Sequence, residues 1–138
     1  MTGTLDVIIA GGGRVGFETA ELLADHGHDV TIIERDERVV DEIADEWVAT
    51  VIRGDATDPG IIEQAGIERA DVVAALTGET GLNLAVCLAA SELSPGIRTV
   101  ARIDRLAGAE YTRFVDAVVF PEHAGARVAA DEIIGSDV

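Results

Sequence analysis

The feature that most constrains this chain is a glycine-rich turn that follows a short apolar run. Residues 7–10 read Val-Ile-Ile-Ala and predict a buried strand, after which the chain continues as Gly-Gly-Gly-Arg-Val-Gly. Gly11, Gly13 and Gly16 have the spacing G-x-G-x-x-G, which after a strand and before a helix is typical of a dinucleotide-binding turn. The first glycine permits the tight turn, the second lets the backbone approach a pyrophosphate, and the third lets the helix lie close to the strand. The unpaired N–H groups and positive dipole end of the following helix favour an anion there.

An acidic residue follows this turn at a sequence distance that is typical of dinucleotide-binding domains. Residues 30–33 predict a second strand, and Glu34 follows it, 18 residues after Gly16. A carboxylate about 20 residues beyond the turn accepts hydrogen bonds from a ribose in dinucleotide-binding domains. The same charge repels a 2′-phosphate, which favours NAD or an adenine nucleotide over NADP. Arg35 weakens this preference because it is able to turn towards a phosphate, and a charged strand end that faces water is the competing interpretation.

The rest of the chain alternates short apolar runs with helix-like segments. The expected strands are residues 7–10, 30–33, 48–52, 71–76, 98–103 and 117–120. The expected helices are residues 15–25, 37–46, 59–65, 81–93, 106–114 and 122–134. This alternation predicts an α/β fold, a Rossmann-like doubly wound parallel sheet of six strands with helices on both faces. Right-handed crossovers give the strand order 3-2-1-4-5-6 and a ligand crevice between the first and fourth strands.

Composition and charge exclude several classes of function. The chain has 138 residues, which suits one domain, and its net charge of −16 argues against a nucleic-acid partner. All ten basic residues are arginine, and an acidic chain without lysine is typical of halophilic proteins, although a GC-rich genome also depletes lysine. The apolar runs are too short to span a bilayer, so we expect no direct membrane insertion.

Four further side chains have structural interpretations. Cys87 is the single cysteine, which fits a reducing compartment and a small core residue of the fourth helix. Trp47 is expected to cover the packing of the second helix. His26 and His28 lack a carboxylate or thiol partner at ligand spacing, so we expect no metal site and place them at a solvated helix end.

Several local motifs together point to a known family. They are the glycine-rich turn, Glu34, Gly-Asp-Ala-Thr-Asp at 54–58, Ala-Asp at 70–71, Thr77 with Asn83, Ala-Arg at 101–102 and Val-Phe-Pro-Glu at 119–122. With this set the chain closely resembles the N-terminal nucleotide-binding domain of the Trk/Ktr potassium-uptake regulators, also called the TrkA-N or RCK N-terminal domain. The resemblance covers essentially the whole chain. Its most discriminating motif is Gly-Asp-Ala-Thr-Asp, which ordinary dehydrogenases do not generally carry.

The resemblance implies a set of residues that contact the bound nucleotide. In it, the glycines cradle the phosphates and Glu34 holds the adenosine ribose. Residues 55–57 border the adenine, and Thr77 lines the crevice near the phosphates or the second ribose. Arg102 reaches either the ligand or an interface. The implied contact residues are Gly11, Gly13, Arg14, Val15, Gly16, Glu34, Arg35, Asp55, Ala56, Thr57, Thr77 and Arg102.

Arg14 and the last expected helix bear on assembly. In the family, an arginine at the position of Arg14 approaches a nucleotide phosphate, in some members across a dimer interface. A ligand with more phosphate charge would recruit this guanidinium more strongly and so bias one dimer arrangement over another. Residues 122–134 include small residues that allow close approach, and in the family this helix lies over a neighbouring subunit. Packing back on its own sheet is the alternative, and the sequence does not separate the two.

The resemblance implies a regulatory function. It points to a cytoplasmic domain that binds NAD(H) or ATP/ADP and controls an integral-membrane potassium transporter or channel, or a cation/proton antiporter. Such a domain acts as a homodimer or higher homo-oligomer and is held at the inner face of the membrane through its partner. Family members commonly continue into a second, smaller regulatory domain, and residues 1–138 hold the nucleotide-binding domain alone. The sequence does not decide between NAD(H) and ATP/ADP.

The alternative function is an NAD-dependent oxidoreductase or its cofactor-binding half. A dehydrogenase needs a substrate pocket and a proton donor or acceptor near the nicotinamide. The expected strands and helices use nearly all residues and leave none for a substrate domain. A Ser-Tyr-Lys arrangement is impossible because the chain has no lysine. We therefore expect no catalytic residues and no enzymatic activity.

Overall fold

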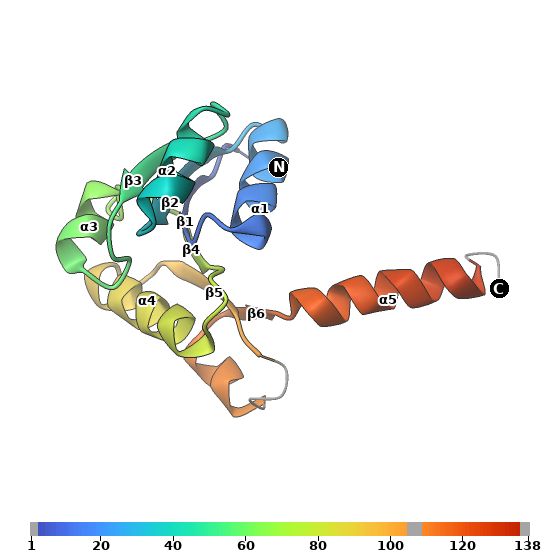
Figure 1. The fold of residues 1–138 in the computed structure, drawn as a ribbon. Helices are drawn as coiled ribbons and strands as arrows, with labels where there is room; N and C mark the ends of the chain where they lie inside the picture. The colour runs from blue at the N-terminus through green and yellow to red at the C-terminus, as the bar shows by residue number, and fades with distance from the viewer. Residues whose placement is uncertain (1–2, 105–108, 136–138) are drawn as a thin grey trace.

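A computed structural model describes residues 3–104 and 109–135 of the chain. In this part of the chain a parallel sheet of six strands has the order β3-β2-β1-β4-β5-β6, which confirms the predicted fold class and strand order (Figure 1). The strands are β1 Asp6–Ala10, β2 Asp29–Glu34, β3 Thr50–Arg53, β4 Val72–Ala75, β5 Arg98–Arg102 and β6 Ala117–Val119. The helices are α1 Arg14–Asp25, α2 Glu37–Ala44, α3 Pro59–Gln64, α4 Thr80–Leu93 and α5 Pro121–Ile134, with a 3₁₀ helix, η2, at Ala109–Phe114.

The sheet separates two hydrophobic cores. Side chains of a strand point alternately to opposite faces, and in β1 Ile8 belongs to one core and Ile9 to the other. The core around Ile8 includes residues of α3 and α4, among them the buried Cys87. The core around Ile9 includes Ala20 of α1 and Ile43 of α2. Helices therefore cover both faces of the sheet, as the doubly wound fold requires.

Cys87 lies in the core, as predicted. Its side chain is 1% exposed, and this burial raises the pKa of the thiol to about 11. The residue is therefore a protonated thiol at neutral pH and is not a nucleophile.

Aspartates begin two of the helices at the edge of the sheet where the strands end. Asp36 accepts a hydrogen bond from the Arg38 N–H at 2.9 Å and caps α2. Asp58 accepts one from the Gly60 N–H at 2.9 Å, and Pro59 occupies the first turn of α3. Each cap satisfies a backbone donor that would otherwise have no partner, so the strand-to-helix turns have fixed conformations.

The prediction for Trp47 is wrong. Helix α2 ends at Ala44 and β3 begins at Thr50, so both elements are shorter than expected. Between them Trp47 has φ of 58°, and its side chain is 91% exposed. Ile43 instead fills the contact between α2 and the sheet, and the left-handed turn leaves the indole in solvent.

Helix α5 does not pack on its own sheet. It extends away from the rest of the molecule (Figure 1), and none of its residues is buried. This excludes one of the two arrangements that the sequence left open. In the described part of the chain, no helix is both long and apolar enough to cross a membrane. Of the expected helix at 106–114, residues 106–108 lie outside the described residues.

The described residues form few ion pairs with one another, which leads to a prediction about salt. The described residues form two, Arg53 with Glu37 at 3.6 Å and Arg102 with Glu122 at 3.0 Å, against a net charge of −16. Because salt screens repulsion between carboxylates in the compact state, the melting temperature is expected to rise by several degrees from low to molar KCl. Circular dichroism melts in KCl, with sucrose as a non-ionic control, measure this. A melting temperature that falls with KCl would contradict the halophilic interpretation.

Candidate functional site

Two glycines of the turn after β1 are required by the packing of the fold itself. Gly11 has φ of +103°, and its N–H donates to the carbonyl of Ile33 in β2 at 2.9 Å. A Cβ on Gly11 would lie 3.0 Å from Cγ2 of Thr77, and a Cβ on Gly16 would overlap the carbonyl oxygen of Gly11. The turn and the first turn of α1 therefore lie in direct backbone contact, which only glycine at these positions permits.

Gly13 differs from these two because it faces open space. It is the N-cap of α1, and a Cβ built on it has no neighbour within 4 Å. No side chain caps this helix, and its first turn carries no acidic residue. The first amides of α1, which belong to Arg14, Val15 and Gly16, thus remain available to an anion approaching Gly13.

The carboxylate of Glu34 is held from two sides by backbone donors. Its Oε1 accepts from the Gly12 N–H at 2.7 Å, and its Oε2 accepts from the Asp36 N–H at 2.8 Å. The side chain is half-buried, so its orientation is fixed before any ligand arrives. The remaining lone pairs of both oxygens can accept the two hydroxyl protons of a ribose.

Sequence reasoning did not assign a role to Gly12. Besides donating to Glu34, Gly12 packs so closely that a Cβ there would collide with Cδ1 of Ile43 in α2. The signal was present as the third glycine in a row, but the G-x-G-x-x-G spacing treats that position as variable.

The loop after β3 presents a second fixed carboxylate. Oδ1 of Asp55 accepts from the Thr57 N–H at 2.9 Å and from the Thr57 hydroxyl at 2.7 Å. These two hydrogen bonds, and to a smaller extent the positive charge of Arg35, lower the pKa of Asp55 below its ordinary value. Asp55 is therefore ionised at neutral pH and acts as an acceptor.

These groups surround a cavity at the ends of the central strands, here called the first cavity. It is lined by Ala10, Gly11, Ile33, Glu34, Arg35, Gly54, Asp55, Ala56, Thr77, Leu82 and Val86. Aliphatic side chains from β2 and α4 line part of it, and the carboxylates of Glu34 and Asp55 add polar acceptors. The cavity is small, about 40 Å³, so a flat base joined to a ribose would lie against its apolar wall beside the carboxylates and would not be enclosed by it. The structure brings six predicted residues together here: Gly11, Glu34, Arg35, Asp55, Ala56 and Thr77.

A second, more polar cavity adjoins the first through Thr77. It is lined by Thr77, Gly78, Thr80, Arg102, Ile103, Asp104 and Glu122, and Arg102 donates to Oε1 of Glu122 at 3.0 Å. The buried Asn83 holds its walls together, because its Nδ2 donates to the carbonyl of Arg102 at 2.8 Å. Its Oδ1 accepts from the Thr77 N–H at 3.0 Å. The sequence marks Asn83 only as part of the family resemblance, because its role as a positioning residue depends on contacts distant in sequence.

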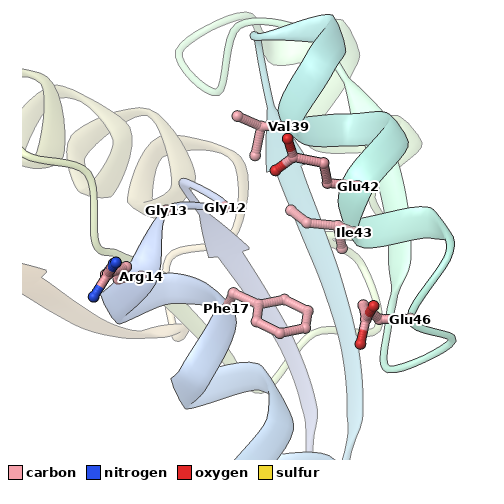
Figure 2. Close-up of a pocket in the computed structure, with 8 residues that line it drawn as sticks. All are labelled: Gly12, Gly13, Arg14, Phe17, Val39, Glu42, Ile43 and Glu46. Carbon is pink, nitrogen blue, oxygen red and sulfur yellow. The ribbon is translucent and has the colours of Figure 1, made fainter.

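The remaining predicted residues lie outside these two cavities. Val15, Gly16 and Thr57 line neither of them, whereas Gly13 and Arg14 border a groove between α1 and α2. Figure 2 shows Phe17, Val39 and Ile43 along this groove and Arg14 pointing away from them. Within the described ranges the Arg14 guanidinium has no hydrogen-bond or ion-pair partner, and no group of side chains is arranged to hold a metal ion.

Comparison with known proteins identifies relatives of this chain. The model of the TrkA-N domain family matches residues 7–121. A Trk system potassium uptake protein TrkA homologue from Pyrococcus abyssi is 40% identical over 127 residues, which are 87% of this chain and 56% of that protein. The chain thus spans about half the length of this curated relative.

Two solved structures have the same fold. The TrkA-N domain of the inner membrane protein ybaL from Escherichia coli superposes with a TM-score of 0.81 at 22% identity, covering 95% of this chain and 98% of that one. The Kef CTD of Shewanella denitrificans in AMP-bound form gives a TM-score of 0.76 at 27% identity. That match covers 94% of this chain and 82% of the Kef chain.

Proposed function

Because the chain belongs to the TrkA-N domain family, we propose that it is a nucleotide-binding regulatory domain of a potassium-transport system. The observation that carries this proposal is the Glu34 carboxylate, fixed by the Gly12 and Asp36 N–H groups beside the first cavity. A preorganised acceptor next to a partly apolar cavity and a glycine turn is what an adenosine with a phosphate requires.

The ligand is an adenine nucleotide, either NAD(H) or ATP/ADP. The adenine would lie against the opening of the first cavity, its ribose would bind Glu34, and its first phosphate would lie at Gly13 and the start of α1. The AMP-bound Kef relative supports the adenosine part of this assignment. The second cavity, beyond Thr77, leaves room for a longer ligand.

The site is suited to binding and not to catalysis. Both carboxylates of the first cavity already accept backbone hydrogen bonds, and the lowered pKa of Asp55 keeps it ionised. The ionised Asp55 carboxylate is a poor proton donor at neutral pH. The relatives' description as potassium uptake proteins agrees with a domain that reports nucleotide binding without turning the ligand over.

A thermal-shift screen tests the proposed function. The melting temperature of the chain, in KCl, is measured with NADH, NAD⁺, ATP, ADP and AMP, and with guanosine and cytidine monophosphates as matched controls. Binding to the folded state alone raises the melting temperature, so at least one adenine nucleotide is expected to do so at concentrations where the controls do not. Equal effects of all bases, or no effect of any, would contradict an adenosine site.

We propose in addition that α5 joins two copies of the chain. Val128, Ile133 and Ile134 are 62%, 84% and 63% exposed on a helix without a buried residue. Large apolar side chains that are exposed on an unpacked helix indicate an interaction surface. The dimer would act at the inner face of the membrane, bound to an integral-membrane potassium transporter or channel.

Light scattering after gel filtration tests the dimer. The unmodified chain is expected to elute as a dimer and the double variant Val128→Glu/Ile133→Glu as a monomer, because the interface would then contain unpaired charges. Glu132→Gln on the same helix is the matched control and should remain dimeric. A monomeric unmodified chain would contradict the assignment.

Arg14 is expected to discriminate among nucleotides by phosphate number. Its guanidinium extends from the first turn of α1 and has no partner in the described structure, so it is available to phosphate oxygens. Arg14→Ala should lower the affinity for ATP about tenfold, as loss of a charged hydrogen bond implies, and lower that for AMP much less. Calorimetric titrations measure both, with the exposed Arg98→Ala as control. Equal losses for AMP and ATP would exclude this role.

A further inference from the structure

One ion pair connects the second cavity to the beginning of α5. The Arg102 guanidinium at the end of β5 lies 3.0 Å from Oε1 of Glu122, which belongs to the first turn of α5. Both side chains line the cavity together with Thr77 and Thr80. The Arg102 side chain is 26% exposed and that of Glu122 is 83% exposed, so the pair lies at the mouth of the cavity.

This cavity lies on the route of a ligand that extends from the first cavity. Thr77 borders both cavities and lies against Gly11, where the phosphate-binding turn begins. Asn83 fixes the backbone of Thr77 and of Arg102 by hydrogen bonds of 3.0 and 2.8 Å. With the backbone fixed, the Arg102 side chain is the movable group that an extending ligand meets.

On the basis of the proposed nucleotide site, we propose that Arg102 exchanges Glu122 for oxygen atoms of the nucleotide beyond its first phosphate. These oxygens belong either to further phosphates or to a second ribose. The exchange removes the side-chain contact between the first turn of α5 and the end of β5, whereas the backbone pairing of β5 with β6 remains. A nucleotide that extends beyond its first phosphate thereby changes the contacts that hold α5, the proposed dimer helix. AMP ends at its first phosphate and leaves these contacts unchanged.

Exchange is favoured over simultaneous binding for two reasons. The Glu122 carboxylate faces the same cavity and repels phosphate oxygens that enter it. Once Arg102 has moved, the Glu122 charge is still stabilised by the N-terminus of α5. An exposed ion pair contributes little, so the pair breaks at small cost when a ligand competes for the guanidinium.

Calorimetric titration of Glu122→Gln with AMP, ATP and NADH tests the exchange. Removing the competing carboxylate is expected to raise the affinity for ATP or NADH, whichever reaches Arg102, by about two- to fivefold, the range that an exposed pair allows. The affinity for AMP should not change. In an Arg102→Ala background the Glu122→Gln substitution should have no effect, because the group for which the ligand competes is gone. Glu132→Gln, further along α5, is the matched control.

Hydrogen exchange gives a second readout that a merely structural ion pair would not change. In the unmodified chain, the amides of residues 124–126, where the helical hydrogen bonds of α5 begin, are expected to exchange faster with the extended nucleotide bound than with AMP bound. If Glu122→Gln leaves the ATP and NADH affinities unchanged or lowers them, while the chain still binds nucleotide, the exchange is wrong and the nucleotide site stands. If the unmodified chain binds none of the three, both proposals fail.

Discussion

Gly16→Ala is expected to destabilise the domain strongly. A Cβ on Gly16 would overlap the carbonyl oxygen of Gly11, and backbone cannot rotate away as a flexible side chain can. Forcing the two apart shifts the whole of α1 against β1, at a cost of about 3 kcal/mol or more. That is a large part of the roughly 5–15 kcal/mol by which a domain is stable. Urea denaturation followed by circular dichroism measures the loss.

Gly13→Ala, three residues earlier, separates folding from binding. Its Cβ would meet no atom within 4 Å. The only expected loss of stability, about 1 kcal/mol, arises because alanine is a poorer N-cap residue than glycine. The added methyl group nevertheless occupies the open space over the first amides of α1, where the phosphate is expected. The variant should fold and lose nucleotide affinity about tenfold or more, equivalent to 1.4 kcal/mol or more.

Gly96→Ala is the control for both variants. A Cβ at position 96 would meet open space, as at Gly13, but Gly96 lies in the turn before β5 and not in the glycine-rich turn. It should fold and bind as the unmodified chain does. A Gly13→Ala variant that binds normally would show that the phosphate does not lie at this turn. A Gly16→Ala variant as stable as Gly96→Ala would show that α1 does not lie as close to β1 as described.

Glu34→Ala is expected to lower the affinity for every adenine nucleotide by about tenfold or more. The substitution removes the acceptor for the ribose hydroxyls and leaves the Gly12 and Asp36 N–H groups without their acceptor. Loss of a hydrogen bond to a charged group costs about 1.5–3 kcal/mol, and these donors must then find water. Because the loss concerns the ribose, it should be similar for AMP, ADP and NADH, unlike the loss in Arg14→Ala.

Glu34→Gln isolates the charge of this residue. The amide keeps the size of the side chain and one acceptor oxygen but no longer repels a 2′-phosphate. The preference for NADH over NADPH should therefore shrink, which fluorescence titration of both reduced nucleotides measures. Glu63→Gln on α3, whose exposed side chain lines neither cavity, is the control. An unchanged preference in Glu34→Gln would mean that the ribose lies elsewhere.

Sequence reasoning placed the residues whose roles follow from local patterns. The glycine spacing, the apolar strand runs and the carboxylate at the end of β2 each depend on a few neighbouring positions, so the sheet order and the position of Glu34 were predictable. Gly12 and Asn83 were not assigned because their roles are contacts with Ile43 and Arg102, which the fold alone brings close. The same limit applies to the ion pair between Arg102 and Glu122, whose partners are 20 residues apart.

Trp47 and α5 show a different limit. An aromatic residue at the end of an amphipathic helix is usually buried, but a left-handed turn at Trp47 places it in solvent. Helix α5 carries small and apolar residues that fit equally a sheet and a second subunit. Its position is decided by the direction in which the chain leaves β6, which no local pattern records.

The most direct test is calorimetric titration of the unmodified chain with AMP, ADP, ATP and NADH, in KCl and with a small ketone present. If the domain binds nucleotide without catalysis, we expect that at least one adenine nucleotide gives heats that saturate at one ligand per chain. We also expect that the calorimetric signal returns to the same baseline after every injection, including the injections of NADH. Heats that never saturate for any of the four, or a sustained signal from NADH oxidation, would contradict the account.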